Sequence, residues 1–198
     1  MEISTLISWL VLVFVIFYII RIFNTLIALK NRFQNSFSQI EVQLKRRYDL
    51  IPNLVETAKA YMGHERETLE AVISARNGAM AGLKEAASNP ANGKALQNLA
   101  SNEGLLQSAL GKLNIAVEAY PELKASENML QLNEELSSTE NRVAFSRQAF
   151  NDAVTEYNSF RQSFPHNLFA PTFGHKKDAS LLEFEDSVEI KQAPRVSF

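Results

Sequence analysis

The 198-residue chain contains no cysteine and is poor in the residues that form turns, with only seven glycines and six prolines. The absence of cysteine excludes a disulfide framework, a thiolate metal site and a cysteine nucleophile. So few turn-forming residues favour a small number of long elements and argue against a fold of many β-strands. The formal net charge of −2 leaves the chain without the positive charge that nucleic-acid binding requires. Thirteen phenylalanines are incompatible with disorder throughout the chain.

The longest uncharged stretch lies near the start of the chain, where residues 3–20 contain no acidic or basic side chain. As a helix these residues span about 27 Å, close to the roughly 30 Å hydrocarbon core of a bilayer. A cleaved signal peptide would need a positively charged start and a small-residue cleavage site, and the sequence offers neither. The pattern therefore predicts a retained transmembrane anchor over residues 1–21, which includes Ile3, Trp9, Tyr18 and Ile20.

Positive charge is distributed unevenly around this anchor. Arg21, Lys30 and Arg32 follow it, whereas Glu2 is the only charged side chain before it. The positive-inside rule places the basic side of a membrane span in the cytoplasm. We therefore expect a single-pass protein with a short N-terminus outside the cell and a cytoplasmic C-terminal domain.

Beyond the anchor, apolar residues recur every three or four positions, which is the spacing of amphipathic helices. The first stripe predicts that the anchor helix continues unbroken to about residue 48. Asp49 is suited to cap a second helix with Pro52 in its first turn, and this helix is predicted to run to about residue 87. A third helix follows a loop at residues 88–93, and a fourth helix ends before Pro165.

These segments predict an all-α fold, in which the anchor continues into a long antiparallel four-helix bundle over residues 22–164 with a coiled-coil-like seam. Residues 165–198 are predicted to form an extended C-terminal tail. Within it, apolar residues alternate with polar ones, which is typical of a half-buried strand or of an arm that docks on its own bundle or on a neighbour. The alternative is a frayed terminus. The alternating residues are Leu182, Phe184, Val188 and Ile190.

Motifs of known chemistry are missing or incomplete. His64 and Glu65 begin a zinc motif that would need a second histidine at position 68, where the chain has Thr68. Glycine-rich phosphate loops and the nucleophile elbow are absent, so we expect no cofactor, no metal and no catalytic residues. The basic run of residues 45–47 is either a contact for anionic lipid or an acidic partner, or a helix C-terminus whose cations face the helix dipole.

The fourth helix carries an unusual number of polar residues near its apolar stripe. Continuing the stripe places Thr139, Glu140 and Arg147 near the seam of the bundle. Buried polar groups need partners, and the end of the first predicted helix and the beginning of the second could supply them. Such a network would either specify the register of the helices or form a ligand site. The flanking polar residues are Asn141, Arg142, Asn151 and Asn158, and the proposed partners are Arg47, Asp49 and Asn53.

Three long segments of the chain resemble the LemA family. They are QLKRRYDLIPNLVETAKAYMGHE (43–65), YPELKASENMLQLNEELSSTENRVAFSRQAFNDAVTEYN (120–158) and FPHNLFAPTFG (164–174), and the closing APRVSF fits as well. The resemblance implies a bacterial membrane protein with one N-terminal span and an antiparallel helical domain. It brings no established catalytic residues. The chain departs from the family pattern at residues 175–177, where His175, Lys176 and Lys177 stand near a position that is more often apolar.

The positions that match the family segments are carried over as motif residues only. They are Arg46, Arg47, Asp49, Pro52, Asn53, His64, Glu65, Glu140, Asn141, Arg142, Arg147, Asn151, Tyr157, Asn158 and Pro165.

Two functions remain in view at this stage. The first is a scaffold in the bacterial inner membrane that self-associates and organises or remodels membrane or recruits other membrane proteins. A relative within the family acts in magnetosome membrane formation, and the resemblance implies such a role here. The second is a sensor that binds a ligand or peptide through the polar groups between the helices. An enzyme is not expected, because none of the carboxylates and histidines has catalytic spacing.

Overall fold

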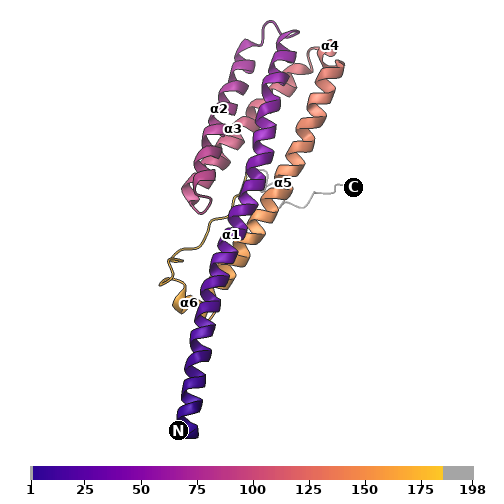
Figure 1. The fold of residues 1–198 in the computed structure, drawn as a ribbon. Coiled ribbons are helices and arrows are strands. Elements are labelled where there is room, and N and C mark those ends of the chain that lie inside the picture. Colours follow the sequence, from indigo (N-terminus) through magenta and orange to yellow (C-terminus); the bar gives the residue numbers. More distant parts are fainter. Residues whose placement is uncertain (1, 185–198) are drawn as a thin grey trace, which may run out of the picture.

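The computed structural model describes residues 2–184, and within this range the chain forms six α-helices and no β-strand (Figure 1). Figure 1 shows α1 rising from the N-terminus, α2 returning beside its distal half, α3 rising again and α5 descending along α1 to α6. The predicted all-α, antiparallel four-helix arrangement is therefore confirmed, with α4 as a short extra turn before α5. The helices are α1 (Ile3–Lys59), α2 (Arg66–Ser88), α3 (Gly93–Val117), α4 (Pro121–Lys124), α5 (Glu127–Gln162) and α6 (His166–Phe169).

The first helix is a single element of 57 residues, about 85 Å long at 1.5 Å per residue. Within residues 2–184, α1 is the one helix long and apolar enough to cross a membrane, judged by length and composition. Ile3, Trp9 and Ile20 are exposed on its N-terminal part, and Tyr18 is half-buried. α1 passes residues 21 and 22 without a break. The predicted continuous helix from the apolar N-terminal segment into the body is therefore confirmed.

The predicted start of a second helix at Asp49 is wrong, because α1 continues through Asp49 and Pro52 to Lys59. A proline inside a helix lacks the N–H that would bond to the carbonyl four residues earlier, which here belongs to Tyr48. The Arg76 side chain of α2 supplies the missing donor, and its Nε lies 2.6 Å from the Tyr48 carbonyl oxygen. The neighbouring helix thus compensates for the proline, and the first turn of the bundle lies at residues 60–65.

Replacing Arg76 by methionine is expected to cost about 1–3 kcal/mol of folding free energy, because it leaves the Tyr48 carbonyl without a donor. The same replacement should cost clearly less in a Pro52→Ala background, where the backbone N–H gained at position 52 can bond to that carbonyl. Thermal unfolding in detergent micelles, followed by circular dichroism, measures both differences. An equal loss in the two backgrounds would show that Arg76 acts on something other than the Tyr48 carbonyl.

The half of the bundle nearer the anchor is built mainly from α1 and α5. Phe33 and Phe37 of α1 meet Phe150 and Tyr157 of α5 edge to face, with ring centroids 5.3–6.3 Å apart. Such edge-on pairs are favoured by the charge distribution of aromatic rings, and all four side chains are buried. Because α2 and α3 lie beside only the distal half of α1 (Figure 1), another element has to cover this part of the core.

The C-terminal tail covers that part of the core. From α6 it runs upward as an extended segment and reaches the N-terminus of α3, where a side chain added at Gly93 would meet the Ser180 hydroxyl. An arm that docks on its own bundle is confirmed for residues 170–184, and a frayed terminus is wrong for them. Val188 and Ile190, the rest of the predicted alternation, lie outside the described residues. The buried tail residues are Ala170, His175, Ala179, Leu182 and Phe184.

Candidate functional site

The centre of the bundle holds a polar group from three helices, which we call the Arg47 cluster (Arg47, Tyr48, Glu103 and Glu140). The Arg47 guanidinium donates to Glu103 Oε2 at 3.0 Å and to Glu140 Oε1 at 3.2 Å. The Tyr48 hydroxyl donates to the second oxygen of Glu103. Arg47, Tyr48 and Glu103 are buried, whereas half of the Glu140 side chain is exposed. The cluster therefore links α1 to both α3 and α5.

Burial governs the electrostatics of this cluster. It raises the pKa of Glu103 above its usual range, and the charge of Arg47 and the hydrogen bond from Tyr48 reverse this only in part. Burial and the neighbouring charge of Glu103 also raise the pKa of Tyr48. Tyr48 therefore stays a neutral donor. With its carboxylates already bonded to Arg47 and Tyr48, the cluster is suited to hold three helices in register.

A hollow of about 110 Å³ adjoins the Arg47 cluster, between α1, α3, α5 and the tail. The guanidinium of Arg147 lies over the Phe184 ring at 4.7 Å from its centroid, a cation–π contact that closes one side of the hollow. Its volume is well below the roughly 300–1,000 Å³ of sites for drug-sized ligands. The hollow is therefore too small for most organic ligands.

Part of the predicted network on the fourth helix is present. Arg47 and Glu140 pair as predicted, and Thr139 and Arg147 are buried. Arg142, predicted to flank the stripe, is exposed and takes no part in the buried network. It follows Glu140 by two residues, which turns its side chain about 200° around the helix. Asn141 is exposed as well.

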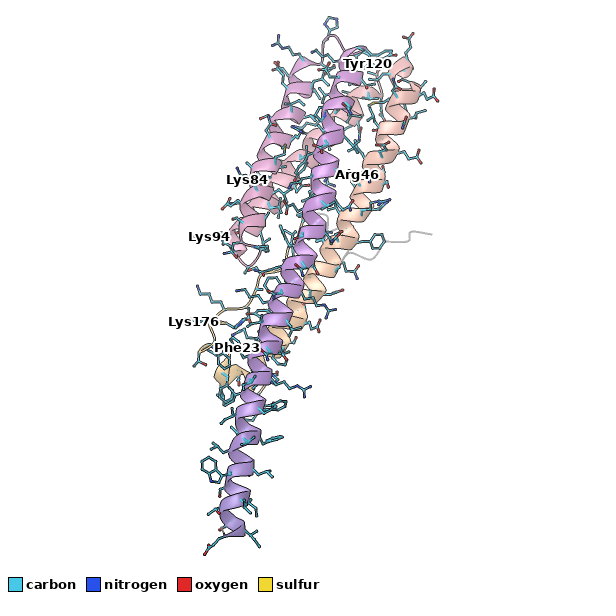
Figure 2. All side chains as sticks on the ribbon, viewed as in Figure 1. Phe23, Arg46, Lys84, Lys94, Tyr120 and Lys176 are labelled. Atoms are coloured by element: carbon cyan, nitrogen blue, oxygen red, sulfur yellow. The ribbon has the colours of Figure 1, made fainter. Side chains whose placement is uncertain are left out.

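The partners predicted beside Arg47 are only partly correct. Asp49 and Asn53 are exposed, because they point about 200° and 240° away from Arg47 around α1. The interpretation of residues 45–47 as a helix C-terminus is wrong, since these residues lie inside α1. Figure 2 shows Arg46 partway along the bundle, where it is exposed. Lys45 pairs with Glu41 at 2.6 Å.

The turn between α1 and α2 carries His64 and Glu65, at the end of the bundle remote from the N-terminus. His64 is exposed, and Glu65 is half-buried. Glu140 pairs with Arg47, twelve residues and about 18 Å before the end of α1, so His64 and Glu140 are not brought together. Among residues 2–184, no group of three or more His, Cys, Asp or Glu could hold a metal ion.

The same end of the bundle has a larger groove of about 670 Å³ between the end of α1 and the start of α2. Its floor is apolar and includes Val55, Met62 and Leu69. Charged residues at its edge are paired along their own helices, Lys59 with Glu56 and Arg66 with Glu70. None of the predicted polar site residues lines this groove.

Two asparagines of α5 hold the tail through its backbone. The Asn151 side chain donates to the carbonyl of Leu182 at 3.0 Å and accepts from its N–H at 2.9 Å. Asn158 makes the same pair of bonds with Ala179, both at 2.9 Å. The seven residues from Asn151 to Asn158 span about 10.5 Å along α5, and the three residues from Ala179 to Leu182 span about 10 Å of extended chain. The asparagines are therefore spaced to match their partners in the tail. The asparagines therefore select an extended segment that runs antiparallel to α5.

Side chains fix the tail at the level of Tyr157. The Tyr157 hydroxyl and His175 Nδ1 are 2.9 Å apart in a buried hydrogen bond. Burial and the nearby charges of Lys30 and Arg161 lower the pKa of His175, which favours its neutral form. Arg161 and Gln162 bind Asp178, with Arg161 Nε 2.8 Å from Oδ1. The departure from the family pattern at His175 therefore places a buried hydrogen-bonding residue in the tail.

Sequence reasoning misses the roles of three important residues. Glu103 falls between Leu99 and Leu106 on the apolar stripe of α3, and a lone carboxylate in such a stripe signals a buried partner. Arg76 falls on the apolar stripe of the second predicted helix, where periodicity alone gives it no role. The docking of His175 has no local signal, because it depends on Tyr157 of another element.

Comparison with known proteins extends the resemblance seen in the sequence. A sequence model of the LemA family matches residues 36–198. Protein LemA of Metamycoplasma hominis is 28% identical over 147 residues, which cover 74% of this chain and 63% of the relative. Magnetosome protein MamQ 2 of Paramagnetospirillum magneticum is 26% identical over 170 residues, 78% of this chain and 62% of the relative. The chain thus spans less than two thirds of the length of these curated relatives.

Proposed function

Because the chain belongs to the LemA family and is a membrane-associated helical protein, we propose that it is a non-enzymatic scaffold of the bacterial inner membrane. In this role it crosses the bilayer once with residues 3–20, associates with copies of itself and recruits or organises membrane components. Its partners are the lipid bilayer, further copies of the chain and other membrane proteins. The similarity to magnetosome proteins supports a role at membranes.

The observation that carries this proposal is the unbroken α1. The same helix contains the apolar segment and the longest stripe of the bundle core, without a loop between them. From residue 22 to Lys59 it extends about 55 Å beyond the apolar segment. A body attached in this way projects from the bilayer as a stiff rod. Stiff, parallel rods in one membrane have a high effective concentration, so weak contacts between them suffice for assembly.

The basic residues that follow the apolar segment support a cytoplasmic body. Arg21, Lys30 and Arg32 lie within the first turns of α1 beyond it, and all three are exposed. Positive charge within about 15–20 residues of a span favours the cytoplasmic side. Labelling of a single introduced cysteine at exposed His64 with a membrane-impermeant reagent tests this orientation. Labelling in intact cells would contradict it.

Phe145 is the side chain through which we expect copies to meet. It lies on α5 with 73% of its surface exposed, whereas aromatic side chains are ordinarily buried in folded domains. α1 and α5 form the part of the body that continues down to the anchor (Figure 1). Neighbours anchored in parallel therefore meet at α1 and α5 along the greatest length.

Replacing Phe145 by glutamate is expected to convert associated protein to monomer, because it places a charge where two apolar surfaces would meet. Ile115→Glu provides the matched control, since Ile115 lies on α3 with 71% exposure. Sedimentation in detergent, or mass photometry in nanodiscs, measures the assembly state of both variants and the wild type. A wild-type protein that stays monomeric at high concentration would contradict self-association itself. Equal assembly of all three proteins would exclude the Phe145 surface.

The alternative of a sensor that binds a ligand between the helices has less support. The hollow beside the Arg47 cluster holds about 110 Å³, and its carboxylates already bond to Arg47 and Tyr48. A ligand there would have to displace these bonds. The scaffold requires no such rearrangement, and it accounts for the exposed apolar residues on the outside of the bundle.

A further inference from the structure

Residues 164–173, which we call the α6 segment, lie against α1 where the apolar anchor ends. The ring of His166 stacks on that of Tyr18 with centroids 6.4 Å apart, and Phe173 meets Phe23 edge-on at 5.1 Å. Figure 1 shows α6 as the part of the body nearest to the N-terminal end of α1. The α6 segment is therefore level with residues 18–23, whereas the rest of the bundle lies farther from the N-terminus.

Internal contacts hold the α6 segment in a defined conformation. The His166 ring also stacks on Phe160 of α5 at 4.0 Å, so it is held between two aromatic rings. The Ser163 hydroxyl lies 2.8 Å from His166 Nδ1, and the Ala170 N–H donates to the His166 carbonyl at 2.8 Å. The α6 segment therefore has a defined conformation, and its exposed apolar side chains are held in fixed positions.

Two large apolar side chains of the α6 segment point away from the protein. Phe164 is 80% exposed and Leu168 is 61% exposed, although both stand next to a well-packed aromatic group. Water contact with this much apolar surface is unfavourable. Neighbouring apolar residues can escape water together when one surface covers them all.

The surface best placed to cover Phe164 and Leu168 is the bilayer that contains the anchor. The exposed apolar face of residues 3–20 is continuous with the α6 segment through the contact of Tyr18 with His166. With residues 3–20 in the hydrocarbon core, Tyr18 reaches the interface, where tyrosine and tryptophan are enriched. Its partner His166 then lies at the same depth, and Leu168 is two residues farther along.

The positive charge near the α6 segment also favours contact with a bilayer that contains anionic lipids. Arg21, Lys30, Lys176 and Lys177 are exposed, and Figure 2 shows Lys176 at about the same height along α1 as Phe23. Glu156 of α5 and Asp178 of the tail are bonded to arginines, which offsets their negative charge. Basic residues close to a bilayer surface attract anionic lipid headgroups.

We propose that the α6 segment is a second membrane contact, which inserts Phe164 and Leu168 into the interface of the bilayer while nearby lysines bind anionic headgroups. This inference rests on the proposed membrane anchor. It means that the body touches the membrane at two points, the span and the α6 segment, and cannot pivot freely about the anchor.

Tryptophan fluorescence in vesicles tests this contact, because the chain has a single tryptophan, Trp9 in the anchor. The test protein carries Leu168→Trp in a Trp9→Phe background. Its matched control carries Leu130→Trp in the same background, since Leu130 is 57% exposed near the start of α5, about 48 Å from the end of that helix. Both are reconstituted in vesicles of phosphatidylcholine and phosphatidylglycerol whose chains are brominated near the headgroup, and the wild type, whose Trp9 lies near the middle of the span, in vesicles brominated near the chain ends.

We expect the tryptophan at position 168 to emit at shorter wavelength and to lose emission in brominated vesicles, while that at position 130 is unaffected. Wild-type Trp9 reports the anchor separately. If Trp9 is quenched and the tryptophan at position 168 is not, the anchor stands and the second contact is wrong. An unquenched but blue-shifted emission at position 168 would assign the surface to a protein neighbour and also overturn the proposal. An unquenched Trp9 would overturn the anchor and with it the contact.

Discussion

Replacing Glu103 by alanine is expected to lower the free energy of unfolding by about 3–5 kcal/mol, which is the range for removing one partner of a buried ion pair. The replacement leaves the Arg47 guanidinium in the core with only half-exposed Glu140 as a partner. It also deprives the buried Tyr48 hydroxyl of its acceptor. α3 loses both of its bonds to α1 at once, so the loss exceeds that of most surface substitutions.

Two further variants separate the charge from the packing at this position. Glu103→Gln keeps the size and an acceptor for Tyr48, and we expect it to lose less stability than Glu103→Ala. The double variant Arg47→Met with Glu103→Leu replaces the pair by apolar side chains and should be more stable than Glu103→Ala alone. Thermal unfolding in micelles ranks the three proteins. If the double variant were the least stable, the pair itself would be a net source of stability.

The pKa of Glu103 adds a dependence on pH. Because burial raises the folded-state pKa above the unfolded value of about 4.3, folding favours the protonated carboxyl. This contribution is complete below the unfolded pKa and is lost as the pH rises through the folded pKa. The stability difference between wild type and Glu103→Gln should therefore shift against the wild type from about pH 4.3 upward. A difference that grows in favour of the wild type over this range would mean that Arg47 outweighs burial.

Replacing both Asn151 and Asn158 by alanine is expected to release the tail from α5. Each asparagine satisfies one N–H and one carbonyl of the tail backbone. The cost is about 1–3 kcal/mol for each buried group left without a partner. Hydrogen exchange at the amides of Ala179 and Leu182 measures the effect directly, and we expect their protection to be lost while that of the bundle core remains.

The control for the asparagine pair lies on the same helix. Asn141→Ala removes an exposed asparagine of α5 and should leave exchange in the tail unchanged. Asn158→Asp keeps the acceptor for the Ala179 N–H and removes the donor to its carbonyl, so an intermediate effect is expected. Unchanged protection of both tail amides in the double variant would show that buried Leu182 and Phe184 hold the tail without the asparagines.

The four long helices and their directions could be predicted from the sequence because they depend on local periodicity and on few breaks. The boundary at Asp49 could not, because a cap followed by Pro52 has the local chemistry of a helix start. Arg76, which reaches the Tyr48 carbonyl from another helix, compensates for the proline within the continuous helix. Tertiary contacts of this kind leave no trace in a window of ten or twenty residues.

The residues of the candidate site could likewise be predicted from the sequence only in part. Glu140 and Arg147 lie on an apolar stripe, and helical spacing alone is enough to place them near the seam. Arg142 flanks this stripe in sequence, and its direction around the helix keeps its side chain exposed. Asn151 and Asn158 are recognisable as flanking polar residues, but their role depends on the backbone of a tail more than twenty residues away.

Because α1 is unbroken, a rotation of the anchor about the helix axis turns the body by the same angle. Each residue advances a helix by about 100°, so the face of the anchor that carries Trp9 stands at a fixed angle to the face of the body beside Phe145. One residue inserted between residues 22 and 32 would turn the body by about 100° relative to its span, and it would separate the α6 segment from the ring of Tyr18. Lipids or helices that orient the span therefore also decide which side of the bundle faces a neighbour.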